Sequence, residues 1–302
     1  MRSLIAIVGP TGVGKSRVGI LVAKALGAEI ISGDAYQFYK GLNIGTAKIK
    51  PEDMDSVPHH LIDILEPTAT FSVKEYQTLA RAKIAELHKR SVLPLMVGGA
   101  GLYLQAVLYD YRFEGERRTD ATKAYYEHLS DQELAELVRK ANPLLAAAIH
   151  THNRRRLLRA LELAGFKDDT LDAHGKMPYY EHSLTIGLSL PRPVLYERIG
   201  TRVDAMIAAG LIEEARGLYQ AAISKQAAMA IGYKELFAHF SGSLSLPEAI
   251  EAIKRNSRRY AKRQMTWFTN QMQPVWFDVE NEDVESTAAR IIAYVKKEAE
   301  AD

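Results

Sequence analysis

The 302-residue sequence contains no cysteine. This absence excludes disulfides, thiol nucleophiles and cysteine-ligated zinc, and it is typical of a protein in a reducing compartment. A large charge imbalance is also missing, because 39 lysines and arginines face 37 aspartates and glutamates, for a net charge of +2. Any nucleic-acid site therefore has to come from local clustering of basic residues and not from bulk charge.

Long hydrophobic runs are absent as well. The apolar run Leu4–Val8 is followed by glycine, proline and Lys15, far short of the roughly 20 apolar residues that a membrane span needs. We therefore expect a cytoplasmic protein with no membrane partner. Nothing in the sequence points to an obligate oligomer, so a monomer is expected.

What is present is a series of alternating short apolar runs and helical patterns. The apolar runs predict buried parallel strands, and the 3.6-residue spacing between them predicts helices. The expected strands are residues 4–8, 29–32 and 93–97, and the expected helices are residues 15–26 and 73–90. This alternation predicts an α/β fold with a doubly wound parallel sheet.

The turn after the first strand carries the clearest motif, G-x-x-x-x-G-K-S. It consists of Gly9, Pro10, Thr11, Gly12, Val13, Gly14, Lys15 and Ser16. A strand before it and a helix after it match the context of a P-loop, so the fold is expected to be P-loop NTPase-like. Backbone N–H groups and the helix N-terminus would hold a diphosphate or polyphosphate, Lys15 would supply a positive charge, and the Ser16 hydroxyl could ligate Mg²⁺.

The acidic residues near this loop are few. A P-loop kinase or hydrolase usually places an acidic metal ligand at the end of another core strand, but the strand 93–97 ends in Gly98 and Gly99. The available acid is Asp34, just beyond the second strand, where the carboxyl ends of parallel strands face the ligand crevice. From position alone, a functional carboxylate and a turn-forming aspartate after Gly33 are equally good interpretations.

The pattern changes near Phe113. Residues 120–166 are rich in helical patterns and poor in strands, and a strand pattern returns at residues 184–188. We therefore expect a helical insertion domain at residues 113–183, within a core made of residues 1–112 and 184–302. The rest of the core should be helical, with a long segment from Ser245 to Gln271 that opens on a Ser245–Glu248 capping box.

Several blocks resemble the tRNA dimethylallyltransferase, or IPP transferase, family. They are the P-loop and residues 31–39, 41–48, 58–63, 98–103, 154–162, 202–206, 210–211, 230–235 and 260–264. The resemblance runs from residue 4 to about residue 278, and it is carried by the order and number of the blocks. The sequence departs from the family pattern at Ala35, where serine is usual, and at Ala100, where threonine is usual.

The resemblance implies transfer of a dimethylallyl group from dimethylallyl diphosphate to an adenine beside the anticodon of tRNA. By similarity, Asp34 is the base that orients the exocyclic amine and takes its proton. Thr11 and Arg202 stabilise the departing diphosphate, assisted by Lys15 and by Mg²⁺ held partly at Ser16.

The resemblance also implies contacts with tRNA, which would be the macromolecular partner. The expected contact residues are Asp34, Ala35, Tyr36, Gln37, Ala100, Lys123, Arg155, Arg156, Leu157, Leu158 and Arg159. A second basic cluster, formed by Arg255, Arg258, Arg259 and Lys262, is predicted along the C-terminal helix; a solvated basic face is the alternative for both clusters. An adenine in a loop is cheaper to extrude than one in a duplex.

Two other functions compete with this hypothesis. A P-loop kinase of a nucleoside or small metabolite would share the phosphate loop but lacks the strand-end carboxylate. A non-catalytic RNA-binding protein would have no need of Asp34 beside a diphosphate site. ATP hydrolysis or phosphoryl transfer without prenyl transfer would favour the kinase.

Overall fold

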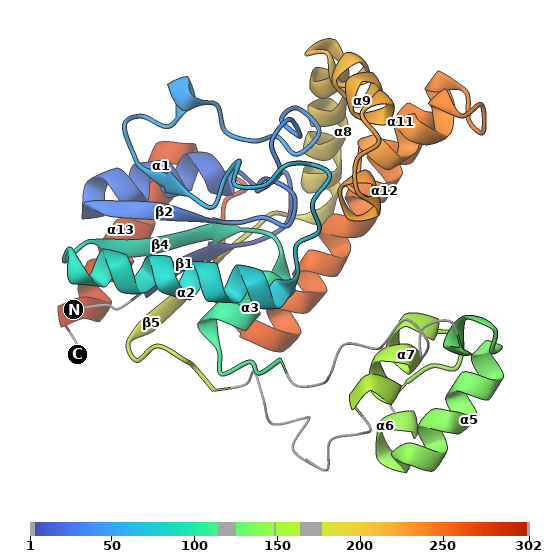
Figure 1. Cartoon of the computed structure of the whole chain (residues 1–302). Helices are drawn as coiled ribbons and strands as arrows, with labels where there is room; N and C mark the ends of the chain where they lie inside the picture. The colour runs from blue at the N-terminus through green and yellow to red at the C-terminus, as the bar shows by residue number, and fades with distance from the viewer. Residues whose placement is uncertain (1–3, 114–124, 148, 164–176, 301–302) are drawn as a thin grey trace. The chain divides into compact units, whose positions relative to one another are not determined.

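The computed structural model of the chain describes residues 4–113, 125–147, 149–163 and 177–300 (Figure 1). The chain divides into two compact units. The first comprises Met1–Asp110 and Gly175–Asp302, and the second comprises Tyr111–His174. Among the described residues, no helix is long and apolar enough to cross a membrane.

The first unit contains one six-stranded sheet in the order β3-β2-β4-β1-β5-β6. All neighbouring strands are parallel. The strands are β1 (Leu4–Val8), β2 (Ala28–Gly33), β3 (His59–His60), β4 (Leu93–Gly98), β5 (Ser183–Ser189) and β6 (Val275–Asp278). The chain builds β2 to β4 on one side of β1 and β5 to β6 on the other, so the order reverses at β1. In an open α/β sheet such a reversal opens a crevice at the carboxyl ends of the strands.

Helices cover both faces of this sheet (Figure 1). The helices of the first unit are α1 (Lys15–Leu26), α2 (Val73–Lys89), α3 (Gly101–Leu108), α8 (Arg192–Ala208), α9 (Leu211–Gln220), α10 (Lys225–Ala228), α11 (Tyr233–Phe240), α12 (Leu246–Trp267) and α13 (Val284–Glu300). Two short turns, η1 (Pro51–Asp53) and the π-helical η2 (Phe268–Met272), complete it.

The alternation of side chains along β1 explains the two layers. Leu4, Ala6 and Val8 belong to the core under α2, α3 and α12, whereas Ile5 and Ile7 belong to the core under α1 and α13. A strand buried on both faces has to be apolar at every position, and all five residues of β1 are fully buried. The doubly wound parallel α/β fold expected from the sequence is confirmed.

The ends of β2 and β4 approach each other unusually closely. Gly33 pairs with Gly98 in the parallel register, and a Cβ atom placed on Gly98 would lie 2.1 Å from the Gly33 carbonyl oxygen. No side chain fits in this space. The contact brings the segment after β2, which carries Asp34, beside the segment after β4.

The second unit is a small helical body. The helices described in it include α5 (Asp131–Ala141), α6 (Pro143–Ala147) and α7 (Arg154–Leu163). Leu134, Val138 and Leu157 form its core. Arg154 fastens it from within, donating to the carbonyl oxygens of Tyr126 and Leu129 (2.7 Å each) and to Asp131 Oδ1 (3.0 Å).

Three details differ from the sequence expectations. The helical unit is shorter than 113–183, because the backbone of Asp110 and Leu108 binds Met177 and Tyr179 and so ties residues 177–182 to the core. The region after β5 is not wholly helical, since the four-residue strand β6 lies at the sheet edge. The long C-terminal helix keeps its Ser245–Glu248 capping box but passes into η2 at Phe268.

Candidate active site

The phosphate loop connects β1 to α1, as the motif predicts. Gly14 precedes α1 in the left-handed conformation (φ 101°). No side chain caps the N-terminus of α1, so its first backbone amides are available to a bound anion. Gly9 lies so close to β5 that a Cβ atom would be 2.6 Å from the Leu188 carbonyl oxygen. Pro10 and Val13 are buried and can contribute only their backbone, whereas Ser16 is exposed at the loop surface.

Gln264 of α12 fixes this loop from the far end of the chain. Its Oε1 accepts a hydrogen bond from the Thr11 backbone N–H (2.8 Å), and its Nε2 donates to the Gly99 carbonyl oxygen (2.8 Å). A Cβ atom on Gly99 would lie 2.3 Å from Gln264 Nε2, which explains why glycine follows β4 here. The Thr11 amide is thus taken by the protein, and its hydroxyl is left without a hydrogen-bond partner among the described residues.

Asp34 lies at the carboxyl end of β2, and its carboxylate is held in one orientation. Oδ1 accepts from the backbone N–H groups of Tyr36 (2.9 Å) and Gln37 (3.3 Å). Burial is the largest influence and raises the pKa of Asp34, while these two amides and the charges of Lys15 and Arg202 act in the opposite direction. A carboxylate with a raised pKa is a stronger proton acceptor than an exposed aspartate.

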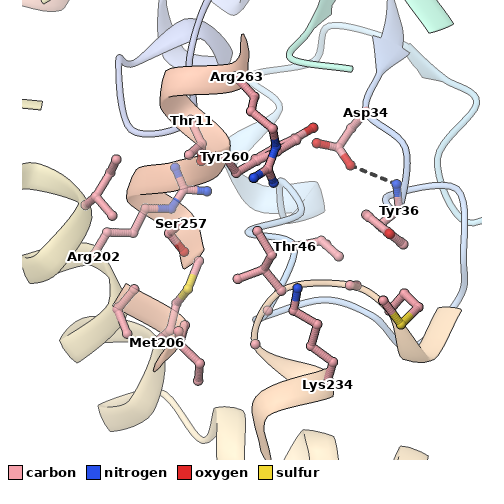
Figure 2. A pocket seen from close by; sticks show the side chains of 18 residues that line it. Thr11, Asp34, Tyr36, Thr46, Arg202, Met206, Lys234, Ser257, Tyr260 and Arg263 are labelled. Carbon is pink, nitrogen blue, oxygen red and sulfur yellow. Dashed lines mark hydrogen bonds between the residues drawn. The ribbon is translucent and has the colours of Figure 1, made fainter. Parts of the chain in front are cut away.

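Two adjoining pockets meet at Asp34, and Figure 2 shows the one that is also lined by Met206 and Lys234. Both are lined by Thr11, Asp34, Thr46, Arg202 and Tyr260. The first, here called the phosphate pocket, extends to Lys15, Ser16, Arg17, Gly99, Arg198 and Gln264. The second, here called the apolar pocket, extends to Ile199, Val203, Met206, Met229, Ile231, Ile253, Lys234, Ser257 and Arg263.

The charges of the phosphate pocket are strongly one-sided. Lys15, Arg17, Arg198 and Arg202 line it, and Asp34 is the only carboxylate among the lining residues of either pocket. Burial, with a further effect from Arg202, lowers the pKa of Lys15 to about 7, and burial also lowers the pKa of Arg202. Cations that repel one another in a partly desolvated pocket are stabilised when a polyanion binds among them.

The structure therefore brings the three predicted catalytic residues together from separate elements. Thr11 comes from the phosphate loop, Asp34 from the end of β2 and Arg202 from α8. Figure 2 shows all three side chains around the same space. No cluster of three or more histidine, aspartate or glutamate side chains able to hold a metal occurs in the described parts of the chain. Ser16 is the protein oxygen that the motif assigns to a metal.

The predicted tRNA-contact residues fall into two groups. Ala35, Tyr36 and Gln37 follow Asp34, and Tyr36 and Gln37 line the pockets. Ala100 precedes α3 and is only 5 % exposed, so its side chain offers almost no contact surface.

The second group lies on α7. Arg155, Arg156 and Arg159 are exposed, Leu158 is half-buried, and Leu157 is 1 % exposed in the core of the helical unit. The Leu157 side chain therefore packs in the core of the helical unit, and the expected tRNA contact at Leu157 stays a prediction. Lys123 lies outside the described residues.

Sequence reasoning missed several pocket residues on α12. The basic residues of this helix indicated one exposed face, yet Ser257, Tyr260 and Gln264 line the pockets from another face. Their spacing of three and four residues places them on one side of a helix, and this was the available signal. The cationic residues Arg198 and Lys234 were missed because a lone charge on a helix has no distinguishing pattern.

Comparison with known proteins gives a consistent result. The family model of the IPP transferases matches residues 37–271. The tRNA dimethylallyltransferase of Geobacillus kaustophilus is 51 % identical over 282 residues, covering 90 % of this chain and 89 % of the relative. That of Bacillus subtilis is 48 % identical over 284 residues, covering 91 % and 90 %.

Crystal structures agree. The full-length tRNA isopentenylpyrophosphate transferase of Bacillus halodurans superposes with a TM-score of 0.77 at 44 % identity, covering 99 % of this chain and 97 % of that chain. A eukaryotic dimethylallyltransferase acting on tRNA superposes with a TM-score of 0.87 at 25 % identity, covering 100 % of this chain and 80 % of that chain.

The fold and the site define a parallel α/β transferase with a P-loop. The chain belongs to the IPP transferase family and is an enzyme of the tRNA dimethylallyltransferase type. The alternative of a P-loop kinase is not favoured, because the relatives are prenyl transferases and neither pocket is lined by a second carboxylate.

Proposed function

We propose that the chain transfers a dimethylallyl group from dimethylallyl diphosphate to the exocyclic N6 amine of the adenosine on the 3′ side of the tRNA anticodon. The observation that carries the proposal is the position of Asp34. It is the lone carboxylate at the junction of a cationic pocket, which suits a diphosphate, and an apolar pocket, which suits a five-carbon chain.

The proposed reaction forms one bond and breaks one. The N6 lone pair attacks the allylic carbon, the bond from that carbon to the diphosphate oxygen breaks, and diphosphate leaves with the electron pair. The N6 proton passes to Asp34. Because Asp34 Oδ1 is held by two backbone amides, Oδ2 is the oxygen proposed to accept the proton.

The cations act on the leaving group. Negative charge develops on the bridging oxygen as the bond breaks, and Arg202 and Thr11 line both pockets together with Asp34. Donors fixed in a partly desolvated pocket stabilise this charge more than they stabilise the intact diphosphate ester. Lys15 and Arg198 would hold the outer phosphate oxygens.

Magnesium is proposed to arrive with the diphosphate. Mg²⁺ retains several waters and is usually held by substrate phosphates with one or two protein oxygens. The Ser16 hydroxyl, which lines the phosphate pocket, would be the protein ligand. When bound, the ion would neutralise charge on the leaving diphosphate.

The tRNA is proposed to bind at Tyr36 and Gln37 beside the pocket and at Arg155, Arg156 and Arg159 on the helical unit. The exposed arginines suit phosphate contacts, which position a nucleic acid without reading its sequence.

The proposal is tested by incubating the purified protein with unmodified tRNA, Mg²⁺ and dimethylallyl diphosphate, followed by nucleoside mass spectrometry. The expected product is an adenosine with one dimethylallyl group, located beside the anticodon by fragment mapping. ATP in place of the prenyl donor is the control, and phosphoryl transfer without any prenyl product would contradict the proposal.

A further inference from the structure

Glu214 of α9 is a carboxylate outside the two pockets that makes an unusual set of hydrogen bonds. It accepts from three consecutive backbone N–H groups, those of Asn43 (3.1 Å to Oε2), Ile44 (2.9 Å to each oxygen) and Gly45 (3.2 Å to Oε1). The Tyr233 hydroxyl donates a fourth bond to Oε1 at 2.6 Å. Charge-assisted bonds of this kind are the strong ones in proteins.

The segment that Glu214 holds forms a wall of the active site. Gly45 lines the apolar pocket, and Thr46 lines both pockets together with Arg202 and Tyr260. The same segment is held from its other side by Gln37, whose Nε2 donates to the Thr46 carbonyl oxygen at 3.2 Å. The wall is therefore clamped between Glu214 and the chain that follows Asp34.

Packing makes the clamp specific. A Cβ atom on Gly45 would lie 2.6 Å from the Tyr233 ring, so the ring lies directly against the backbone of the wall. Burial, followed by the charge of Glu214, raises the pKa of Tyr233, which keeps its hydroxyl protonated as a donor. Tyr233 begins α11, and the preceding residues Ile231 and Gly232 line the same pocket.

Charge adds a second reason for a carboxylate at this position. Successive backbone N–H groups that converge on one point form an anion-binding nest. Here the nest lies in a wall of a site lined by Lys15, Arg202 and other cations, where phosphate groups are attracted. Glu214 fills the nest from within the protein, so the amides of residues 43–45 are already bound and do not offer a second site for a phosphate group.

We propose that Glu214 is a positioning residue that fixes the 43–46 wall and thereby seats the acceptor adenosine against Asp34, without contributing to the diphosphate seat. The inference rests on the proposed function for the identity of the acceptor. It assigns a role in the reaction to a residue that lines neither pocket.

The test compares Glu214→Ala and Tyr233→Phe with Glu213→Ala, which removes an exposed carboxylate from the neighbouring position of α9. For Glu214→Ala, kcat/KM for tRNA should fall about 10-fold or more, because several charge-assisted bonds are lost together. For Tyr233→Phe the fall should be about 3-fold, because one bond is lost and the ring remains. The Kd for inorganic diphosphate, measured by calorimetry, should stay within about 2-fold for all three variants.

Hydrogen exchange supplies a readout that does not depend on turnover. The amides of residues 43–45 should exchange faster in Glu214→Ala, with the amides of β1 and β4 unchanged. Three results for Glu214→Ala would each overturn the inference. They are an unchanged kcat/KM for tRNA, a loss of diphosphate affinity as large as the loss in kcat/KM, and faster exchange throughout the first unit. An inactive wild-type protein would refute the proposed function instead, and exchange at residues 43–45 would still decide whether Glu214 fixes the wall.

Discussion

Replacing Asp34 by alanine or asparagine tests the chemistry most directly. Asparagine keeps the Oδ1 acceptor that binds the amides of Tyr36 and Gln37, so the segment after β2 should retain its conformation. It places an NH₂ group where Oδ2 lies, and this donor would face the N6 amine, which is also a donor. Both variants therefore lose the proton acceptor, and only alanine also loses the local hydrogen bonds.

The expected loss in the rate of prenyl transfer is about 100-fold or more, the range for removal of a general base. This corresponds to about 2.7 kcal/mol of transition-state stabilisation. The rate should be measured under single-turnover conditions with enzyme in excess over tRNA, and tRNA affinity should be measured separately by filter binding. Affinity should stay largely intact, since Asp34 offers no positive charge to the RNA.

A matched control is Asp53→Asn, which neutralises an exposed aspartate in η1 away from both pockets. Its single-turnover rate should equal that of the wild type. If Asp34→Asn reacted at the wild-type rate once tRNA was bound, or if it lost tRNA binding with an unaffected bound rate, the assignment of Asp34 as the base would be refuted.

Three further outcomes follow from the structure. Burial lowers the pKa of Lys15 to about 7, so its amine is mostly neutral at about pH 8 before diphosphate binds. Binding of diphosphate should raise this pKa, so the wild type should take up about one proton more on binding than Lys15→Met does. Calorimetry in buffers of different ionisation enthalpy measures this proton uptake. Gly98→Ala should destabilise the fold by about 3 kcal/mol, because the added Cβ would lie 2.1 Å from the Gly33 carbonyl oxygen. Gly200→Ala should stabilise the fold slightly, because Gly200 lies inside α8 with open space around it. Thermal unfolding of the two variants compares these effects. Arg154→Ala should speed hydrogen exchange in α5, because three backbone acceptors and a carboxylate lose their donor, whereas Arg155→Ala should not.

Local patterns were sufficient to predict much of this fold. Short runs rich in apolar residues predicted β1, β2, β4 and β5, and the Ser245–Glu248 capping box marked a helix start that the structure confirms. The strands β3 and β6 were not predicted, because two and four residues are too few to show a period. They are strands only because a neighbouring strand offers them hydrogen bonds.

The site divides in the same way. The phosphate loop and Asp34 are local features, a motif and a strand end. Gln264 and Glu214 act through contacts with residues 253 and about 170 positions away, which no local pattern reports. Glu214 is preceded by Glu213, and the two are indistinguishable in the sequence, yet one binds the active-site wall and the other faces solvent.

The Gln264 bridge has a consequence for the order in which the protein matures during synthesis. The phosphate loop leaves the ribosome long before α12, because the side chain that ties its Thr11 amide to the end of β4 lies 253 residues later. Domains generally fold from the N-terminus during translation. A nascent chain that ends before Gln264 can contain the complete motif and still lack the bridge that fixes it. Competence to bind substrate should therefore appear late, when α12 packs against the sheet.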